Sequence, residues 1–99
     1  MKQKTSIFIT PAAERSCKKL PKEVSDFILS EVPSFLRENP LRGDMLSPPL
    51  RPLRSFHFSI GGQKYRVAYE FQAHVKKIII HLAGYRGGFY ERLKRLLGK

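Results

Sequence analysis

The chain has 99 residues, 41% of them hydrophobic, and a formal net charge of +11 at pH 7. This length suits one domain, residues 1–99, and no apolar run approaches the roughly 18 residues of a membrane span or forms a signal peptide, so we expect a cytoplasmic protein with no membrane partner. The single cysteine excludes an internal disulfide, and the three histidines lack chelating spacing, so we expect no metal and no cofactor.

The first third of the chain predicts one strand and two helices. Residues 6–9, "SIFI", have the composition of a short strand, and Thr10 followed by Pro11 is a typical helix start. Pro21 ends this helix and begins a second one over residues 22–37, whose apolar stripe is Val24, Phe27, Ile28, Phe35 and Leu36. Pro33 predicts a kink or break within that second helix.

A loop and a hairpin follow. Residues 38–52, "ENPLRGDMLSPPLRP", hold four prolines and a glycine, which predicts an ordered loop without regular structure. Residues 54–69 then alternate between apolar and polar side chains on either side of Gly61, Gly62 and Gln63, as in two half-buried strands joined by a tight turn. His57 and Arg66 share the polar face, where cross-strand neighbours lie about 5 Å apart.

A third strand, "VKKIIIHLA", follows a turn at Ala73 and His74. Its consecutive isoleucines point to both faces of the sheet, as in a strand buried on both faces, so we place it in the middle of the sheet. Residues 89–97 then predict a short basic helix after a glycine-rich passage. The order is β-α-α-β-β-β-α, an α+β fold with a mostly antiparallel twisted sheet and the two N-terminal helices on one face. The other face is expected to stay open, so that Arg54, His57, Arg66 and residues 86–90 converge on it.

Positive charge is concentrated in the second half of the chain. Residues 1–44 hold eight Lys and Arg against six acidic residues, whereas residues 45–99 hold eleven against Glu70 and Glu91 alone. Such a field attracts nucleic acid, an acidic protein or an anionic membrane, although only the C-terminal tail comes close to a membrane-binding helix. The candidate RNA-contacting residues are Arg54, Ser55, Lys64, Lys76, Lys77, Arg92, Lys94 and Arg95.

Four segments together resemble the RelE/ParE superfamily of bacterial toxins, in the same order and at the same spacing. They are "FITPAAERSCKKLP", "RENPLRGDML", "YRVAYEF" and "GYRGGFYERL". The resemblance implies the RelE-like fold and an acidic antitoxin that binds the toxin as a hetero-oligomer. It also implies one of two activities, because RelE-like members cut mRNA in the ribosomal A site whereas ParE-like members inhibit DNA gyrase.

By this resemblance, the catalytic positions of the RelE branch fall on His57, Arg66, Arg86 and Tyr90. The lysine pair of some RelE members is replaced by Ser55 and His57, which leaves the acid and base roles open. Metal-independent cleavage by the ribose 2′-hydroxyl needs a base, for which an imidazole is suited near neutral pH, and a cation for the phosphorane, for which a guanidinium is suited. It also needs an acid for the departing 5′ oxygen, and Arg86 is expected either to contact the phosphate or to serve this leaving group. Tyr90 is expected to stack on a base or hold the nucleophile.

Three functions follow as hypotheses. The first is a type II toxin that acts as a ribosome-dependent endoribonuclease, with mRNA and ribosomal RNA as partners beside the antitoxin. The second is a ParE-like gyrase inhibitor without nuclease activity. The third is a simple nucleic-acid-binding module, whose affinity would depend strongly on salt and which would not be toxic.

Overall fold

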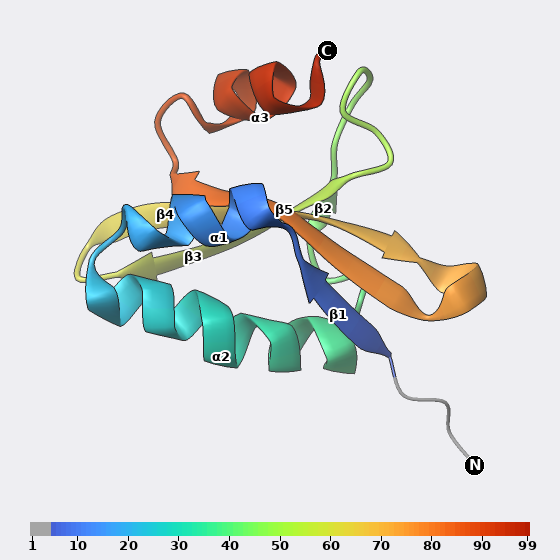
Figure 1. The fold of residues 1–99 in the computed structure, drawn as a ribbon, viewed down its shortest axis with the longest axis horizontal. Coiled ribbons are helices and arrows are strands. Elements are labelled where there is room, and N and C mark those ends of the chain that lie inside the picture. The colour runs from blue at the N-terminus through green and yellow to red at the C-terminus, as the bar shows by residue number, and fades with distance from the viewer. Residues whose placement is uncertain (1–4) are drawn as a thin grey trace.

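The computed structural model describes residues 5–99, so residues 1–4 of the predicted domain lie outside the described part of the chain. Its order is β1 (Ser6–Ile9), α1 (Pro11–Lys18), α2 (Lys22–Glu38), β2 (Asp44–Met45), β3 (Arg54–Ile60), β4 (Gln63–Gln72), a 3₁₀ turn (Ala73–Val75), β5 (Lys77–Tyr85) and α3 (Phe89–Leu97). The five strands form one sheet in the order β1-β5-β4-β3-β2, in which β1 is parallel to β5 and the other pairs are antiparallel (Figure 1). The predicted α+β class is confirmed.

The two N-terminal helices form as predicted, apart from the break at Pro33. The Thr10 hydroxyl accepts a hydrogen bond from the Ala13 amide at 3.1 Å, and Pro11 occupies the first turn of α1. Of the predicted kink or break, the break is wrong, because α2 runs through Pro33 without interruption. Ile28, Val32 and Leu36 are fully buried on either side of the proline, and this packing holds the helix together despite the missing amide donor.

The loop predicted over residues 38–52 contains a strand. Asp44 pairs with Ser55 and Met45 with Arg54, which adds β2 to the edge of the sheet. The prediction missed this strand because two residues carry no periodicity. The loop is held by Tyr69, whose hydroxyl donates to the Pro40 carbonyl at 2.7 Å and accepts from the Gly43 amide at 2.8 Å.

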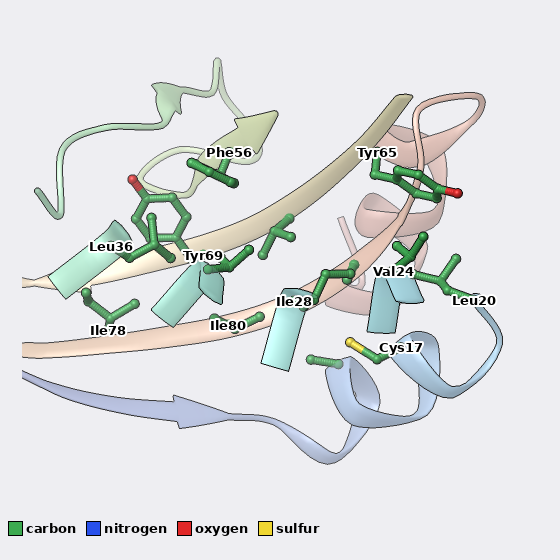
Figure 2. Packing of buried hydrophobic residues seen from close by; sticks show 14 residues of the cluster. Cys17, Leu20, Val24, Ile28, Leu36, Phe56, Tyr65, Tyr69, Ile78 and Ile80 are labelled. Carbon is green, nitrogen blue, oxygen red and sulfur yellow. The ribbon is translucent and has the colours of Figure 1, made fainter. Parts of the chain in front are cut away.

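The main core lies between the sheet and α1 and α2. Figure 2 shows Cys17, Val24, Ile28 and Leu36 of the helices, with Leu20 of the connection between them, facing a row of strand residues, Phe56, Tyr65, Tyr69, Ile78 and Ile80. The predicted apolar face of the hairpin is therefore confirmed. β5 is an interior strand as predicted, between β1 and β4, although β4 is the central strand.

The opposite face of the sheet is not open, as had been expected. A second core forms there between the sheet, α3 and the segment after β2, and its buried residues are Leu50, Leu53, Ala68, Leu82, Phe89 and Leu93. Figure 1 shows α3 and this segment on the side of the sheet away from α2. The loop and the last helix thus cover part of the face and leave the hairpin end of it uncovered.

An irregularity in β5 turns apolar residues of the same parity to opposite faces of the sheet. Ala68 pairs with Leu82 and Tyr69 with Ile80, so His81 is an extra residue in β5 and forms a β-bulge. Before the bulge Ile78 and Ile80 face the helices α1 and α2, and after it Leu82 faces α3. The bulge thus allows one strand to supply both cores.

Candidate active site

His57 and Arg66 are direct cross-strand partners on the uncovered part of the sheet. The register of β3 and β4 pairs His57 with Arg66, and Arg66 pairs in turn with Gly84 of β5. Directly opposed residues have their side chains on one face with Cβ atoms about 5 Å apart, so the predicted pairing of imidazole and guanidinium is present. The β3–β4 turn is tighter than expected, because Gln63 already belongs to β4 and only Gly61 and Gly62, with φ of 58° and 80°, form the turn.

Arg86 joins these two residues from the segment between β5 and α3. Its amide donates to the Lys64 carbonyl at 3.0 Å, which fixes the chain just beyond the hairpin. A depression of about 340 Å³ is lined by His57, Arg66 and Arg86, and a neighbouring one of about 400 Å³ is lined by Arg66, Arg86 and Tyr90. The two depressions share both arginines, so the four predicted catalytic residues border two adjoining depressions, together called the groove.

Tyr90 of α3 supports Arg66. The guanidinium carbon of Arg66 lies 4.6 Å from the centroid of the Tyr90 ring, within the range of a cation–π interaction. The Arg66 Nε is buried and has no hydrogen-bond partner among the described residues. A buried donor of this kind is normally satisfied, so the Arg66 Nε is an exception to the usual pairing of buried polar atoms.

The surroundings of His57 favour its neutral form. Burial lowers the pKa of His57 from its ordinary value, and the positive charges of Arg66 and Arg86 lower it further, against an opposing effect of the Asp44 carboxylate. A neutral imidazole can accept a proton, so at neutral pH this side chain is in the state that a general base requires.

Two of the predicted RNA-contacting residues are not on the uncovered surface. Arg54 pairs with Tyr69 and so lies on the face covered by α2, where its guanidinium donates to the Leu41 and Gly43 carbonyls at 3.3 and 2.9 Å. Ser55 lies on the opposite face but is only 2% exposed, and its hydroxyl has no partner among the described residues. The predicted placement of Arg54 on the open face is wrong, because its parity matches that of Phe56. Ser55 lies on the same face as His57, as its parity predicted, but the second core covers it.

The lysines divide between the two ends of the sheet. Lys64 is exposed and lines the depression that contains His57, as predicted for a residue beside the site. Lys77 is the first residue of β5, seven residues before Gly84 and so about 23 Å away along the strand, and Lys76 lies just before it. The structure therefore separates them from the groove, and they do not belong to one surface with His57.

The basic residues of α3 have different surroundings. Arg92 donates to the carbonyls of Tyr85 and Gly87, so its guanidinium is engaged with the chain itself. The Lys94 ammonium lies 3.9 Å from the Glu91 carboxylate and borders another depression together with Tyr90. Arg95 is exposed in the last turn.

Asp44 is a residue of the site that the sequence did not indicate. It stands opposite Ser55 at the edge of the sheet, acts on the pKa of His57 and borders the depression shared by Tyr90 and Lys94. Only the two-residue strand β2 brings it there, so nothing in the sequence pattern could have placed it.

Two further properties of the described residues concern membrane spanning and metal binding. None of the helices in residues 5–99 combines the length and the apolar character that a membrane crossing needs. Within the same residues, no group of three or more His, Cys, Asp or Glu side chains is arranged to ligate a metal.

The fold is similar to that of several solved toxin structures. The toxin–antitoxin complex RelBE2 from Mycobacterium tuberculosis matches with a TM-score of 0.71 and 22% identity over 85% of this chain and 100% of that one. A mutant of the E. coli toxin RelE in the free state matches with a TM-score of 0.70 and 14% identity over 94% and 98%. The archaeal RelE–RelB complex from Pyrococcus horikoshii OT3 matches with a TM-score of 0.56 and 20% identity over 86% and 98%.

Residues 7–94 match the family described as the ParE-like toxin of type II bacterial toxin–antitoxin systems. The match covers most of the sequence, so the chain belongs to this family, and the predicted relation to the RelE/ParE superfamily is confirmed. No curated protein matches the sequence. At these identities the solved structures establish the fold, whereas the activity has to be argued from the residues of the groove.

Proposed function

We propose that the protein is a ribosome-dependent endoribonuclease that cuts mRNA by attack of the ribose 2′-hydroxyl on the adjacent phosphate. The observation that carries this proposal is the cross-strand pair of His57 and Arg66, with Arg86 on the same groove. His57 can accept a proton, and the two arginines can stabilise the negative charge that develops on the phosphate.

In the first half of the reaction His57 takes the proton of the 2′-hydroxyl. Its lowered pKa keeps the imidazole neutral and ready to accept that proton. The 2′ oxygen then forms a bond to phosphorus, and negative charge builds up on the non-bridging oxygens. Arg66 offers this charge the terminal amino groups of its planar guanidinium, which stays protonated throughout.

In the second half the bond between phosphorus and the 5′ oxygen breaks. The products are a 2′,3′-cyclic phosphate and a 5′-hydroxyl, and the departing oxygen takes its proton from water, because guanidinium groups release theirs only at strongly basic pH. Arg86, on the shared wall of the two depressions, stabilises the phosphorane together with Arg66. The ring of Tyr90 holds the Arg66 guanidinium by a cation–π interaction.

The form of the site supports the proposed dependence on the ribosome. The four residues border two open depressions on the surface, so we propose that a second surface holds the RNA with the 2′ oxygen in line with the leaving oxygen. Ribosomal RNA is a polyanion that suits a chain with a net charge of +11.

An acidic antitoxin is the second proposed partner. Two of the similar solved structures are complexes of RelE-type toxins with their antitoxins. A partly disordered acidic segment that folds on the basic surface would neutralise it and cover the groove. If the antitoxin instead displaces α3, removal of residues 89–99 should change its affinity, and an unchanged affinity counts against displacement.

Gyrase inhibition is the competing function, and the ParE-like family match favours it. A gyrase inhibitor acts by binding and needs no group that transfers protons. Growth arrest that survives the combined His57→Ala and Arg66→Ala change would support this alternative.

Mapping of transcript ends in cells tests the proposal. After induction of the wild-type toxin, primer extension should reveal new 5′ ends within translated mRNA, and these should disappear in the His57→Ala plus Arg66→Ala variant. Arg15→Ala, an exposed change on α1, serves as the control for lost charge. Intact transcripts during growth arrest would refute the nuclease.

A further inference from the structure

Arg92 links α3 to the turn that carries Arg86. One amino group of its guanidinium, Nη2, donates to the Tyr85 carbonyl at 3.0 Å, and the other, Nη1, donates to the Gly87 carbonyl at 2.9 Å. These carbonyls belong to the residues immediately before and after Arg86. A single planar fork therefore holds the backbone on both sides of the site arginine.

The turn needs such a support because two glycines follow Arg86. Gly88 has a φ of 68°, in the left-handed region, and glycine backbones are the least restricted of all residues. Inside the turn, the Arg86 amide donates to the Lys64 carbonyl at 3.0 Å, and the Phe89 amide donates to the Arg86 carbonyl at 3.3 Å. The Arg92 fork completes this set of contacts from α3.

The sequence of β5 leaves room for the guanidinium. A Cβ atom at Gly84 would lie 2.7 Å from the Arg92 Nη2, so any larger residue there would push the fork away. Gly84 is the cross-strand partner of Arg66. The Arg92 guanidinium, which lies against Gly84, is therefore one strand away from Arg66. The Arg92 guanidinium also lies 5.8 Å from the centroid of the Phe89 ring.

We propose that Arg92 is a positioning residue that sets Arg86 on the wall of the groove, and that Gly84 is required to admit it. This inference rests on the proposed function only in the role given to Arg86; the support of the turn does not depend on it. A direct contact of Arg92 with RNA, as the sequence suggested, is the competing role, and it would require the fork to leave both carbonyls.

Amide hydrogen exchange of the free toxin tests the support without any activity. In Arg92→Met the amides of Arg86 and Phe89 should exchange about tenfold faster, because two hydrogen bonds from a charged donor are lost, while amides in the middle of β4 stay unchanged. Gly84→Ala, which keeps the arginine but displaces it, should produce the same local change. Arg92→Lys should not restore protection, because an ammonium cannot reach both carbonyls with one planar fork.

A double-mutant cycle on programmed ribosomes tests the link to Arg86. Arg92→Met should slow single-turnover cleavage about tenfold in the wild-type background and have no further effect in an Arg86→Ala background. Arg15→Met is the matched control for the loss of one charge. If Arg92 contacts RNA directly, the two losses multiply and the salt dependence of binding falls, which overturns the proposal.

The two measurements separate the possible failures. Unchanged exchange of the Arg86 and Phe89 amides in both Arg92→Met and Gly84→Ala would overturn the positioning role whatever the activity. Absence of cleavage by the wild-type protein would refute the proposed function, and the exchange measurement would still decide whether Arg92 holds the turn.

Discussion

The guanidinium carbon of Arg66 lies 4.6 Å from the centroid of the Tyr90 ring, so α3 covers one side of a cation that β4 contributes to the groove. This contact joins residues from two separate elements and restricts the arginine before any ligand arrives. A partly desolvated cation–π interaction contributes about 1–2 kcal/mol. We therefore assign Tyr90 a role in holding Arg66 rather than in transferring a proton.

Substitutions at Tyr90 distinguish these roles. Tyr90→Phe keeps the ring and should retain most of the cleavage rate, whereas Tyr90→Ala should lower the rate about tenfold because Arg66 loses its support. Single-turnover rates on programmed ribosomes provide the comparison. An equally large loss in Tyr90→Phe would show that the hydroxyl group takes part in the reaction.

The pH dependence of cleavage should follow the titration of His57. The pKa of this imidazole is lowered by burial and by the charges of Arg66 and Arg86, so its inflection in an NMR titration should fall below the ordinary value for histidine. A general base acts when unprotonated, so the rate should rise with pH through that inflection and then level off.

Arg66→Ala provides the matched test of this explanation. Removal of the positive charge should move the His57 inflection upward, toward the ordinary value, while Arg15→Ala leaves it in place. A rate that falls as pH rises through the His57 inflection would assign the imidazole the role of acid.

The hairpin and the helices were predictable because they repeat. Alternation over residues 54–69 placed His57 and Arg66 on one face, and Thr10 with Pro11 marked the start of α1. Strand β2 has two residues and no period, so Asp44 could not be placed. The bulge at His81 reverses the parity of β5, and only that reversal places Leu82 under α3. Periodicity therefore predicted the pairing of His57 with Arg66 but not the second core beside these residues.

Tyr69 should make a measurable contribution to stability through its hydroxyl group. Tyr69→Phe leaves the Gly43 amide and the Pro40 carbonyl without their partner, and both lie next to a fully buried ring. We expect the free energy of unfolding to fall by about 1–3 kcal/mol in urea titrations. A change below about 0.5 kcal/mol, the usual effect of a surface substitution, would mean that water replaces the lost hydroxyl.

Cys17 should be unreactive in the folded protein. Its side chain is fully buried, and burial together with the charge of Glu14 raises the pKa of the thiol to about 11. A thiol reagent at pH 8 should therefore label Cys17 only as fast as the protein unfolds, and labelling should become rapid in denaturant. Fast labelling without denaturant would indicate that α1 opens from the sheet.

The central claim is that His57, Arg66 and Arg86 form a nuclease site, and cleavage on programmed ribosomes tests it most directly. Purified wild-type protein should cut mRNA in the A site and leave 2′,3′-cyclic phosphate ends. His57→Ala, Arg66→Ala and Arg86→Ala should each lower the single-turnover rate, for Arg66 by about 100- to 1000-fold. Intact mRNA, together with gyrase supercoiling that is inhibited equally by the wild-type protein and by His57→Ala, would contradict the account.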